Sequence, residues 1–396
     1  MILYYTDTPI LCQFAFSCCA RWQKIPFLHL SALPVFNGHD AAVFAKNNAV
    51  TGDKSGKATQ AFCRERVIIL YETRKKRWFS LLCSCLLALS LSSPAWAVEG
   101  ERTLIPLGKA VGIKLFADGA LVVSLEGSDT LKVGDLLLKV NDTRVQSTEQ
   151  LQSLLQKNGS MPVSMQVRRG QRLITFTDTP RCGSDGVYRL GAWIRDSMAG
   201  VGTLTYYDPQ TASYGALGHG ITDVDTAQLM TLSGGSIMET TVKAVKKGEK
   251  GDPGELKGDF TVQRDVGTLT ANTNGGIFGK VADAAFIDTA QAIPVAAASE
   301  VKCGPATILS TVSGSETKAY QVEILRLYGS GQDTRNLMLK VTDPQLLAAT
   351  GGIVQGMSGS PIIQNGKLVG AVTHVLIDDP SRGYGIFMEN MLKMTG

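Results

Sequence analysis

The chain has 396 residues, 44% of them apolar and 19% charged, with a formal net charge of +4. These values are those of an ordinary globular protein, so charge alone suggests no nucleic-acid partner. The length provides for two or three domains with buried cores. Abundant glycine and many short runs of Val, Ile, Leu and Thr favour a mainly β fold.

The first hundred residues have a different character. Four cations, Arg74–Arg77, precede an apolar run over 78–91 and the small-x-small sequence Ala95-Trp96-Ala97. This layout predicts a secretory signal over 74–97, which is either cleaved or kept as a membrane anchor. Because a signal normally begins a chain, residues 1–73 are predicted to be a mis-annotated or disordered extension. The alternative is an unusual cytoplasmic extension.

Cleavage after Ala97 would leave Cys182 and Cys303 of the eight cysteines. An exported chain with two cysteines permits one disulfide, although the spacing alone does not show one. The alternative is that both thiols are small buried hydrophobes.

Residues 104–178 predict a small α+β domain. Leu121–Leu125 is a short apolar strand, and a second strand leads into Asn141 after a Gly-Asp turn. The sequence Ser147-Thr-Glu-Gln150 predicts a capping box, followed by a helix that ends at Asn158-Gly159. Two strands around 163–167 and 173–176 predict a closing hairpin.

This order of elements resembles a PDZ domain. In PDZ domains a peptide end adds as a strand to an open sheet edge, and backbone amides of a preceding loop receive its carboxylate. The matching segment is Gly108–Gly112 followed by Ile113–Leu115. The resemblance therefore implies peptide binding by Gly112, Ile113 and Leu115. The alternative is a small domain that only docks on its neighbour.

Residues 180–396 contain many short strand-like segments separated by Gly, Asp, Asn and Pro, and no long helical period. About 215 residues of this kind predict one β barrel or a pair of barrels.

A Gly-x-Ser-Gly-x-Pro sequence lies near the C-terminus, at Gly356–Pro361. It resembles the nucleophile loop of trypsin-like proteases, which makes Ser358 the predicted nucleophile and Ser360 a turn residue. The amides of Gly356 and Ser358 are the predicted oxyanion hole, because a glycine permits the dihedral angles that such a loop needs.

A serine nucleophile needs a base, and the exported part of the chain has two histidines. His219 lies in a turn of small residues and is the predicted base. His374 lies in the strand after the serine loop, where a packed structural role is favoured. A carboxylate usually orients the base, and residue types alone do not choose among Asp223, Asp225 and Asp343.

A closer resemblance covers nearly all of residues 74–396. The run Val341–Val375, the segments "YDPQTASYGALGHGITD" and "GTLTANTNGGIFG", and the order of signal, PDZ domain and peptidase resemble the stage IV sporulation protein B peptidases. In that family the triad is His, Asp and Ser, which implies His219, Asp343 and Ser358 here. The implied fold is a PDZ domain followed by a trypsin-like double β-barrel, with no metal or cofactor.

The resemblance also implies a biological role. These peptidases are exported across the forespore membrane into the intermembrane space, where they cleave themselves. They then cleave a membrane-anchored regulator, which signals activation of a late mother-cell sigma factor. The expected partners are thus peptide or protein substrates, the chain itself and a membrane, and not nucleic acid. The alternatives are a proteolytically silent PDZ scaffold and a general quality-control protease.

Overall fold

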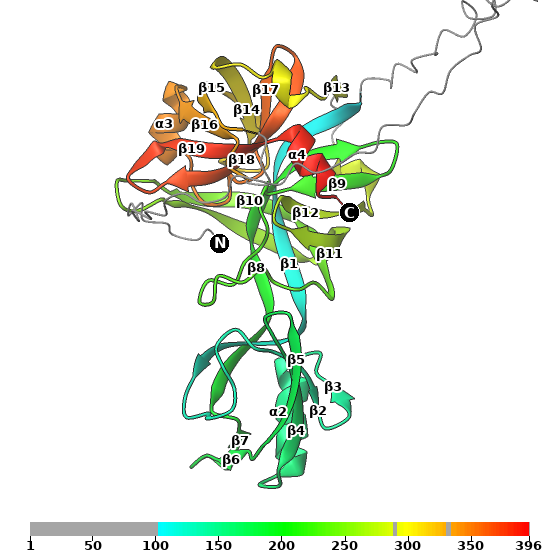
Figure 1. Cartoon of the computed structure of the whole chain (residues 1–396). Helices are drawn as coiled ribbons and strands as arrows, with labels where there is room; N and C mark the ends of the chain where they lie inside the picture. Colours follow the sequence, from blue (N-terminus) through cyan, green and yellow to red (C-terminus); the bar gives the residue numbers. More distant parts are fainter. Residues whose placement is uncertain (1–101, 288–290, 330–333, 396) are drawn as a thin grey trace, which may run out of the picture. The chain divides into compact units, whose positions relative to one another are not determined.

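The computed structural model describes residues 102–395, apart from 288–290 and 330–333. The predicted signal at 74–97 and the predicted extension at 1–73 lie outside these residues. Within the described ranges, no helix combines the length and the apolar character of a membrane span. Two six-stranded barrels and the small α+β domain predicted to be a PDZ domain account for most of the described chain (Figure 1).

The first barrel contains a strand that precedes the PDZ domain in the chain. Its order is β10-β11-β12-β9-β8-β1, and a pairing of β1 with β10 closes it. At Val111, for example, β1 pairs with Gly202 on one edge and Glu239 on the other. The strands are β1 (Thr103–Leu125), β8 (Ala192–Asp208), β9 (Ser213–Ala216), β10 (Gly234–Lys246), β11 (Glu255–Thr273) and β12 (Gly276–Val281).

The PDZ domain is inserted into this barrel between β1 and β8. After a register shift, the last residues of β1 pair both with the start of β8 and with β2, which leads into the PDZ sheet. The inserted elements are β2 (Leu136–Val140), β3 (Thr143–Arg144), α2 (Thr148–Asn158), β4 (Val163–Arg169), β5 (Arg172–Asp178), β6 (Arg181–Cys182) and β7 (Tyr188–Arg189). The prediction that the peptidase domain begins at residue 180 is therefore wrong for one strand, since residues 103–116 complete the barrel.

Local sequence signals account well for helix α2. The Ser147 hydroxyl accepts a hydrogen bond from the Gln150 amide at 3.1 Å, and Gly159 ends the helix with φ of 65°. The Gln150 side chain reaches back to the amide of Gln146, one residue earlier than a standard capping box requires. Leu151 and Leu155 form the buried face. The capping prediction is thus confirmed at its first bond and shifted at its second.

The second barrel closes in the order β14-β15-β16-β19-β18-β17. A short helix, α3, precedes the serine loop, and a second one, α4, ends the described chain. The elements are β14 (Gly304–Ser310), β15 (Lys318–Leu327), β16 (Leu337–Val341), α3 (Pro344–Thr350), β17 (Pro361–Gln364), β18 (Lys367–Leu376), β19 (Asp379–Phe387) and α4 (Met388–Lys393). A two-residue strand, β13 (Ile293–Pro294), lies between the barrels in sequence and pairs with the start of β1.

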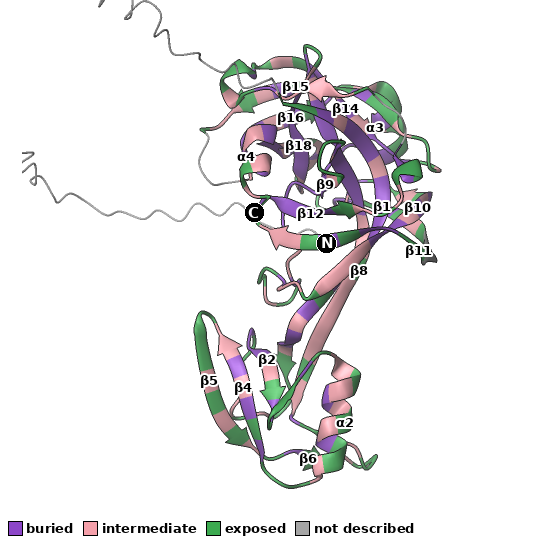
Figure 2. Cartoon of the chain, turned by 90° about the vertical axis from the view of Figure 1, so that its right-hand side faces the viewer, coloured by how far each residue is buried: buried purple, intermediate pink, exposed green. Residues whose placement is uncertain are grey.

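Each barrel has its own apolar core, and in Figure 2 buried residues line the barrel strands. Leu115, Ile237 and Ile277 are fully buried in the first barrel. Ile308 and Leu339 are fully buried in the second. The predicted mainly β fold with a PDZ domain and a double barrel is confirmed. The cysteines Cys182 and Cys303 are exposed free thiols, so the alternative of two buried hydrophobes is wrong.

Candidate active site

The serine loop is held in shape by two glycines with positive φ. Gly356 has φ of 97° and Gly359 has φ of 98°, values that favour glycine. A Cβ on Gly359 would lie 2.1 Å from the carbonyl oxygen of Thr203. No side chain fits at that position, because the loop packs directly against strand β8.

Thr203 fastens this loop to the first barrel. Its hydroxyl donates to the Gly356 carbonyl at 2.7 Å, and its amide donates to the Ser358 carbonyl at 3.1 Å. With these carbonyls engaged, the loop is fixed on both sides of the predicted oxyanion hole. Among the described residues, neither the Gly356 amide nor the Ser358 amide donates a hydrogen bond to the protein. Both N–H groups therefore remain free to bind an oxyanion. Sequence reasoning missed Thr203, whose fully buried hydroxyl has no motif around it.

His219 follows strand β9 in a tight turn whose two preceding residues, Leu217 and Gly218, both have φ of 68°. Its Nδ1 lies 2.9 Å from the Gly220 carbonyl oxygen. Since a carbonyl only accepts, the neutral ring carries its proton on Nδ1 and keeps a lone pair on Nε2. Nε2 is buried and has no partner among the described residues. This is the tautomer that a general base for a serine hydroxyl requires.

Asn272 holds the next part of the His219 turn. Its Oδ1 accepts from the Ile221 amide at 2.8 Å, and its Nδ2 donates to the carbonyls of Ile221 and Met230 at 2.9 and 2.8 Å. The side chain thereby joins strand β11 to the residues that follow the histidine. Sequence reasoning missed Asn272 too, although asparagine is uncommon in strands and its presence there was the available signal.

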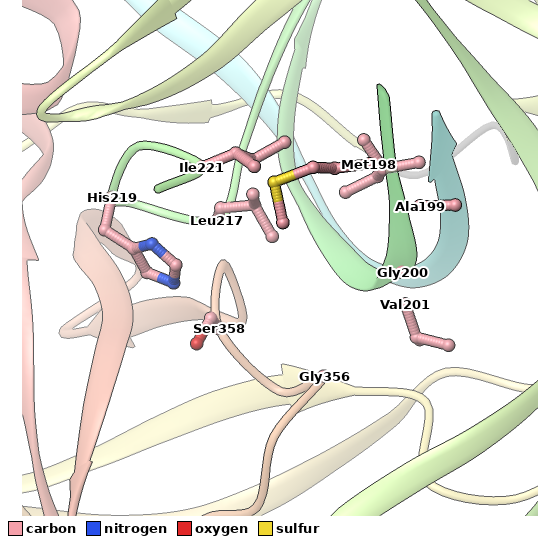
Figure 3. Close-up of a pocket in the computed structure, with 10 residues that line it drawn as sticks. Met198, Ala199, Gly200, Val201, Leu217, His219, Ile221, Gly356 and Ser358 are labelled. Carbon is pink, nitrogen blue, oxygen red and sulfur yellow. The ribbon is translucent and has the colours of Figure 1, made fainter. Parts of the chain in front are cut away.

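Ser358 and His219 line the same small pocket, as Figure 3 shows. The pocket holds about 40 Å³, enough for a few water molecules. Met198–Val201 of β8 supply much of its other wall. The Ser358 hydroxyl donates to the Thr373 carbonyl at 2.7 Å. It must turn away from that carbonyl to donate to Nε2 of the histidine, so this arrangement precedes the reactive one.

A second imidazole lies beside the first. The rings of His219 and His374 are 5.1 Å apart between centroids, and Nδ1 of His374 is buried without a partner among the described residues. Burial lowers the pKa of His219 to about 4, although its hydrogen bond to Gly220 acts in the opposite direction. Burial, and then the charges of His219 and Arg335, lower the pKa of His374 to about 3. Both rings are therefore neutral near pH 7.

Asp343 does not reach the histidine in this structure. Its Oδ1 accepts from the amides of Gln345 and Leu346 at 2.9 and 3.0 Å, and its Oδ2 accepts from the Gln321 amide at 3.2 Å. Asp343 is thus the N-cap of helix α3. The assignment of Asp343 as the orienting carboxylate needs correction, because the Gly220 carbonyl occupies the Nδ1 position. Asp223 forms ion pairs and turn hydrogen bonds with Arg195, Asp225 and Thr226 and is not at Nδ1 either.

The predicted peptide-binding residues of the PDZ domain also need correction. Gly112, Ile113 and Leu115 lie in the barrel half of β1, where one edge pairs with β8 and the other with β10. A peptide strand has no free edge to join there. The prediction failed because the same alternating apolar pattern suits a barrel strand, and its partners are distant in the sequence.

The comparisons with known proteins agree with this architecture. The model of the SpoIVB peptidase S55 family matches residues 186–392, which is more than half of the chain. The chain belongs to the SpoIVB peptidase S55 family. A PDZ domain model matches residues 130–169. This SpoIVB-family chain is therefore a serine peptidase with a PDZ domain.

Solved structures show partial likenesses to this SpoIVB-family peptidase. The active form of the Rv3671c protease from M. tuberculosis has 18% identity and a TM-score of 0.27, covering 50% of this chain and 73% of that one. Its inactive form has 17% identity and a TM-score of 0.29, covering 50% and 82%. The PDZ domain of the SdrC-like protein from Listeria monocytogenes has 17% identity and a TM-score of 0.18, covering 19% and 87%. At these TM-scores the likenesses support no further statement. No curated protein matches the chain.

Proposed function

We propose that this chain is an exported serine endopeptidase of endospore formation that cleaves itself and a membrane-anchored regulator. That second cleavage would signal activation of a late mother-cell sigma factor. The family assignment supports this role. The observation that carries the proposed chemistry is that Ser358 and His219 line one pocket of the described chain, with Nδ1 of His219 bonded to a carbonyl and its Nε2 without a partner among the described residues.

The proposed reaction follows from the atoms in the pocket. His219 Nε2 takes the hydroxyl proton of Ser358 as its oxygen attacks a peptide carbonyl. The amides of Gly356 and Ser358 bind the developing oxyanion, and removal of one such donor typically costs about 3–4 kcal/mol of transition-state stabilisation. His219 then passes the proton to the leaving amine, and water repeats the sequence on the acyl-enzyme.

The imidazolium that forms in this reaction needs a hydrogen-bond acceptor at Nδ1. In this structure the Gly220 carbonyl supplies it at 2.9 Å. A neutral carbonyl stabilises a cation less than a carboxylate does. We therefore expect a slower peptidase than one with a complete triad, which suits an enzyme that cuts few bonds at a defined time.

The proposed location is the space between the forespore and mother-cell membranes, with membrane attachment through residues 74–97 before self-cleavage. The support for this is the signal-like sequence of Arg74–Ala97.

Self-cleavage tests the proposal directly. Purified full-length protein and its Ser358→Ala variant are incubated side by side and followed by gel electrophoresis and intact mass. The wild type is expected to trim itself N-terminal to the PDZ domain, and the variant to stay whole. If a fluorophosphonate probe labels neither protein and both stay whole, the catalytic assignment fails and a silent PDZ scaffold becomes the better account.

The biological part of the proposal needs a spore-forming host. In a strain that lacks its own peptidase of this family, the wild-type chain should restore heat-resistant spores and the Ser358→Ala variant should not. Cleavage of many unfolded proteins without restored sporulation would favour a quality-control protease instead.

A further inference from the structure

Strand β8 has one edge that no described strand occupies over much of its length. Its other edge pairs with β1 from Ala192 to Tyr207. On the first of these edges, β9 pairs only with the part from Leu204 onward. The residues before Leu204 thus present an open edge that begins in the PDZ domain and ends beside Ser358.

At the catalytic end, the backbone groups of this edge point toward the pocket. The Thr203 amide donates to Ser358, and the Thr203 carbonyl accepts from the Leu217 amide, so both groups face away from β1. The register with β1 is continuous through this part of β8. Because strand backbone groups alternate with a period of two, the N–H and C=O groups of Val201 and Ala199 face the same way.

At the PDZ end, the same edge faces helix α2. Val122 donates to the Asp135 carbonyl and accepts from the Gly134 amide, just before β2, so its partner on β8, Ile194, directs its backbone groups away from β1. Ile194 lines a groove together with Gln152 and Gln156 of α2 and with Val187. A groove between a helix and an open strand edge is the form that accepts an added peptide strand.

Ile194 and Val201 are seven residues apart, so the outward-facing groups at the two ends of the edge are out of phase. The edge changes phase between Arg195 and Ser197, where the register with β1 shifts.

The geometry points to one occupant for the whole edge: an extended polypeptide segment that follows the bond being cleaved and carries one bulge where the edge changes phase. This inference rests on the proposed roles of Ser358 and His219. His219 protonates the leaving amine, and the pocket beside it is walled by Met198–Val201, so the leaving half of the substrate departs along β8. It then runs from Val201 toward Ile194, antiparallel to β8, and enters the groove beside α2.

The length of this edge sets a requirement on substrates. The span from Val201 to Ile194 is about 23 Å at the rise of an extended strand. A substrate must therefore continue for about eight to ten residues beyond the cleaved bond to reach the PDZ groove. The PDZ domain acts in this way as an extension of the active-site cleft.

A peptide library tests the requirement whatever the natural substrate is. A bacterial proteome is digested to peptides, the library is incubated with the full-length protein, and products are identified by mass spectrometry. We expect cleavages that leave about eight or more residues on the C-terminal side to be enriched by about tenfold over shorter ones, as two or more added hydrogen bonds would give. Equal cleavage at all distances from the peptide end would overturn the inference.

A proline substitution in β8 tests whether the length preference depends on pairing of the peptide with this strand. Ile194→Pro removes only an N–H that faces the groove, and we expect it to abolish the length preference. Leu173→Ser, an exposed change on β5 outside the groove, is the control and should keep the preference. Melting curves check that both variants fold. A preference that persists in folded Ile194→Pro protein would refute the inference.

Two further experiments test the inference without relying on the folding of a variant or on turnover. The best-cleaved peptide is resynthesised with N-methyl groups at alternate positions in the first few residues after the cleaved bond, which pair with Ala199 and Val201 before the edge changes phase. One of the two patterns should lower kcat/KM by about tenfold while the other does little. If both patterns act alike, the strand pairing is wrong. A binding experiment needs no turnover: the library is bound to the Ser358→Ala protein and to the Ser358→Ala, Ile194→Pro double variant. If the double variant no longer retains the long peptides, pairing of the peptide with β8 is supported. If both proteins bind the long peptides equally, the inference is overturned, even if Ser358 is not the nucleophile.

Discussion

The Asp343→Asn variant distinguishes most clearly between two roles of Asp343, as a helix cap and as a catalytic carboxylate. Asparagine caps a helix about as well as aspartate does, because its side-chain oxygen accepts the same amide hydrogen bonds. The variant would keep the bonds from Gln345 and Leu346 and would lose the one from Gln321. We therefore expect a loss of about 1 kcal/mol in unfolding free energy and a change in kcat of less than about fivefold, since Asp343 does not contact His219.

Asp343→Ala removes both acceptor oxygens and so all three hydrogen bonds, and it measures the free energy that the cap contributes. Loss of an N-cap costs about 0.5–2 kcal/mol. For a chain of this size, that corresponds to a fall in melting temperature of about 2–6 °C. The assay combines thermal unfolding with kcat for peptide cleavage at saturating substrate, with Ser358→Ala as the inactive control.

The opposite outcome is equally well defined. In a complete triad, the change from carboxylate to amide lowers kcat by about 10⁴-fold, because the imidazole is held in the wrong tautomer. If folded Asp343→Asn protein lost activity on that scale, Asp343 would have to move to His219 during catalysis. The assignment of the Gly220 carbonyl as the Nδ1 partner would then be wrong.

Three further predictions concern the same site. The acid limb of the pH profile of kcat/KM should lie well below pH 6.5, near the lowered His219 pKa of about 4, and a limb near 6.5 would contradict this. The free energy of unfolding should also fall as pH drops from about 6.5 toward 4, because the unfolded chain binds the proton more readily than the folded chain does. Gly359→Ala should abolish fluorophosphonate labelling and lower the melting temperature, whereas Gly366→Ala, with positive φ but open space, should only be mildly destabilising. Asn272→Ala should lower kcat by about tenfold or more in steady-state kinetics, because it frees the amide and the carbonyl of Ile221 beside His219. An unchanged kcat would show that Asn272 does not position the histidine.

Local patterns were enough to predict the parts of the fold that depend on neighbours in sequence. The Ser147 cap and the Gly159 stop define α2 within a dozen residues. The serine loop was equally readable, because Gly356 and Gly359 are demanded by the backbone of the loop itself. These features follow from steric and hydrogen-bonding rules that act over a few residues.

The parts that could not be predicted depend on distant pairings. Residues 103–116 have the same apolar alternation whether they belong to a PDZ sheet or to a barrel, and only their partners on β8 and β10 decide between the two. The tautomer of His219 is set by the carbonyl of the next residue, and this contact depends on turn geometry with no sequence signature. The roles of Ser358 and His219 as nucleophile and base stay predictions until they are measured.

The insertion of the PDZ domain within the first barrel limits where the chain can be shortened without loss of the enzyme. A cut anywhere between Thr103 and Phe116 would separate part of strand β1 from the rest of the chain. If that part were lost, its neighbours β8 and β10 would be left with unpaired backbone groups. Self-trimming that preserves activity must therefore fall before Thr103. By the same reasoning, a deletion of residues 104–178 would report on a broken barrel, and only removal of the insert between the paired residues Phe116 and Ser197 would isolate what the PDZ domain contributes.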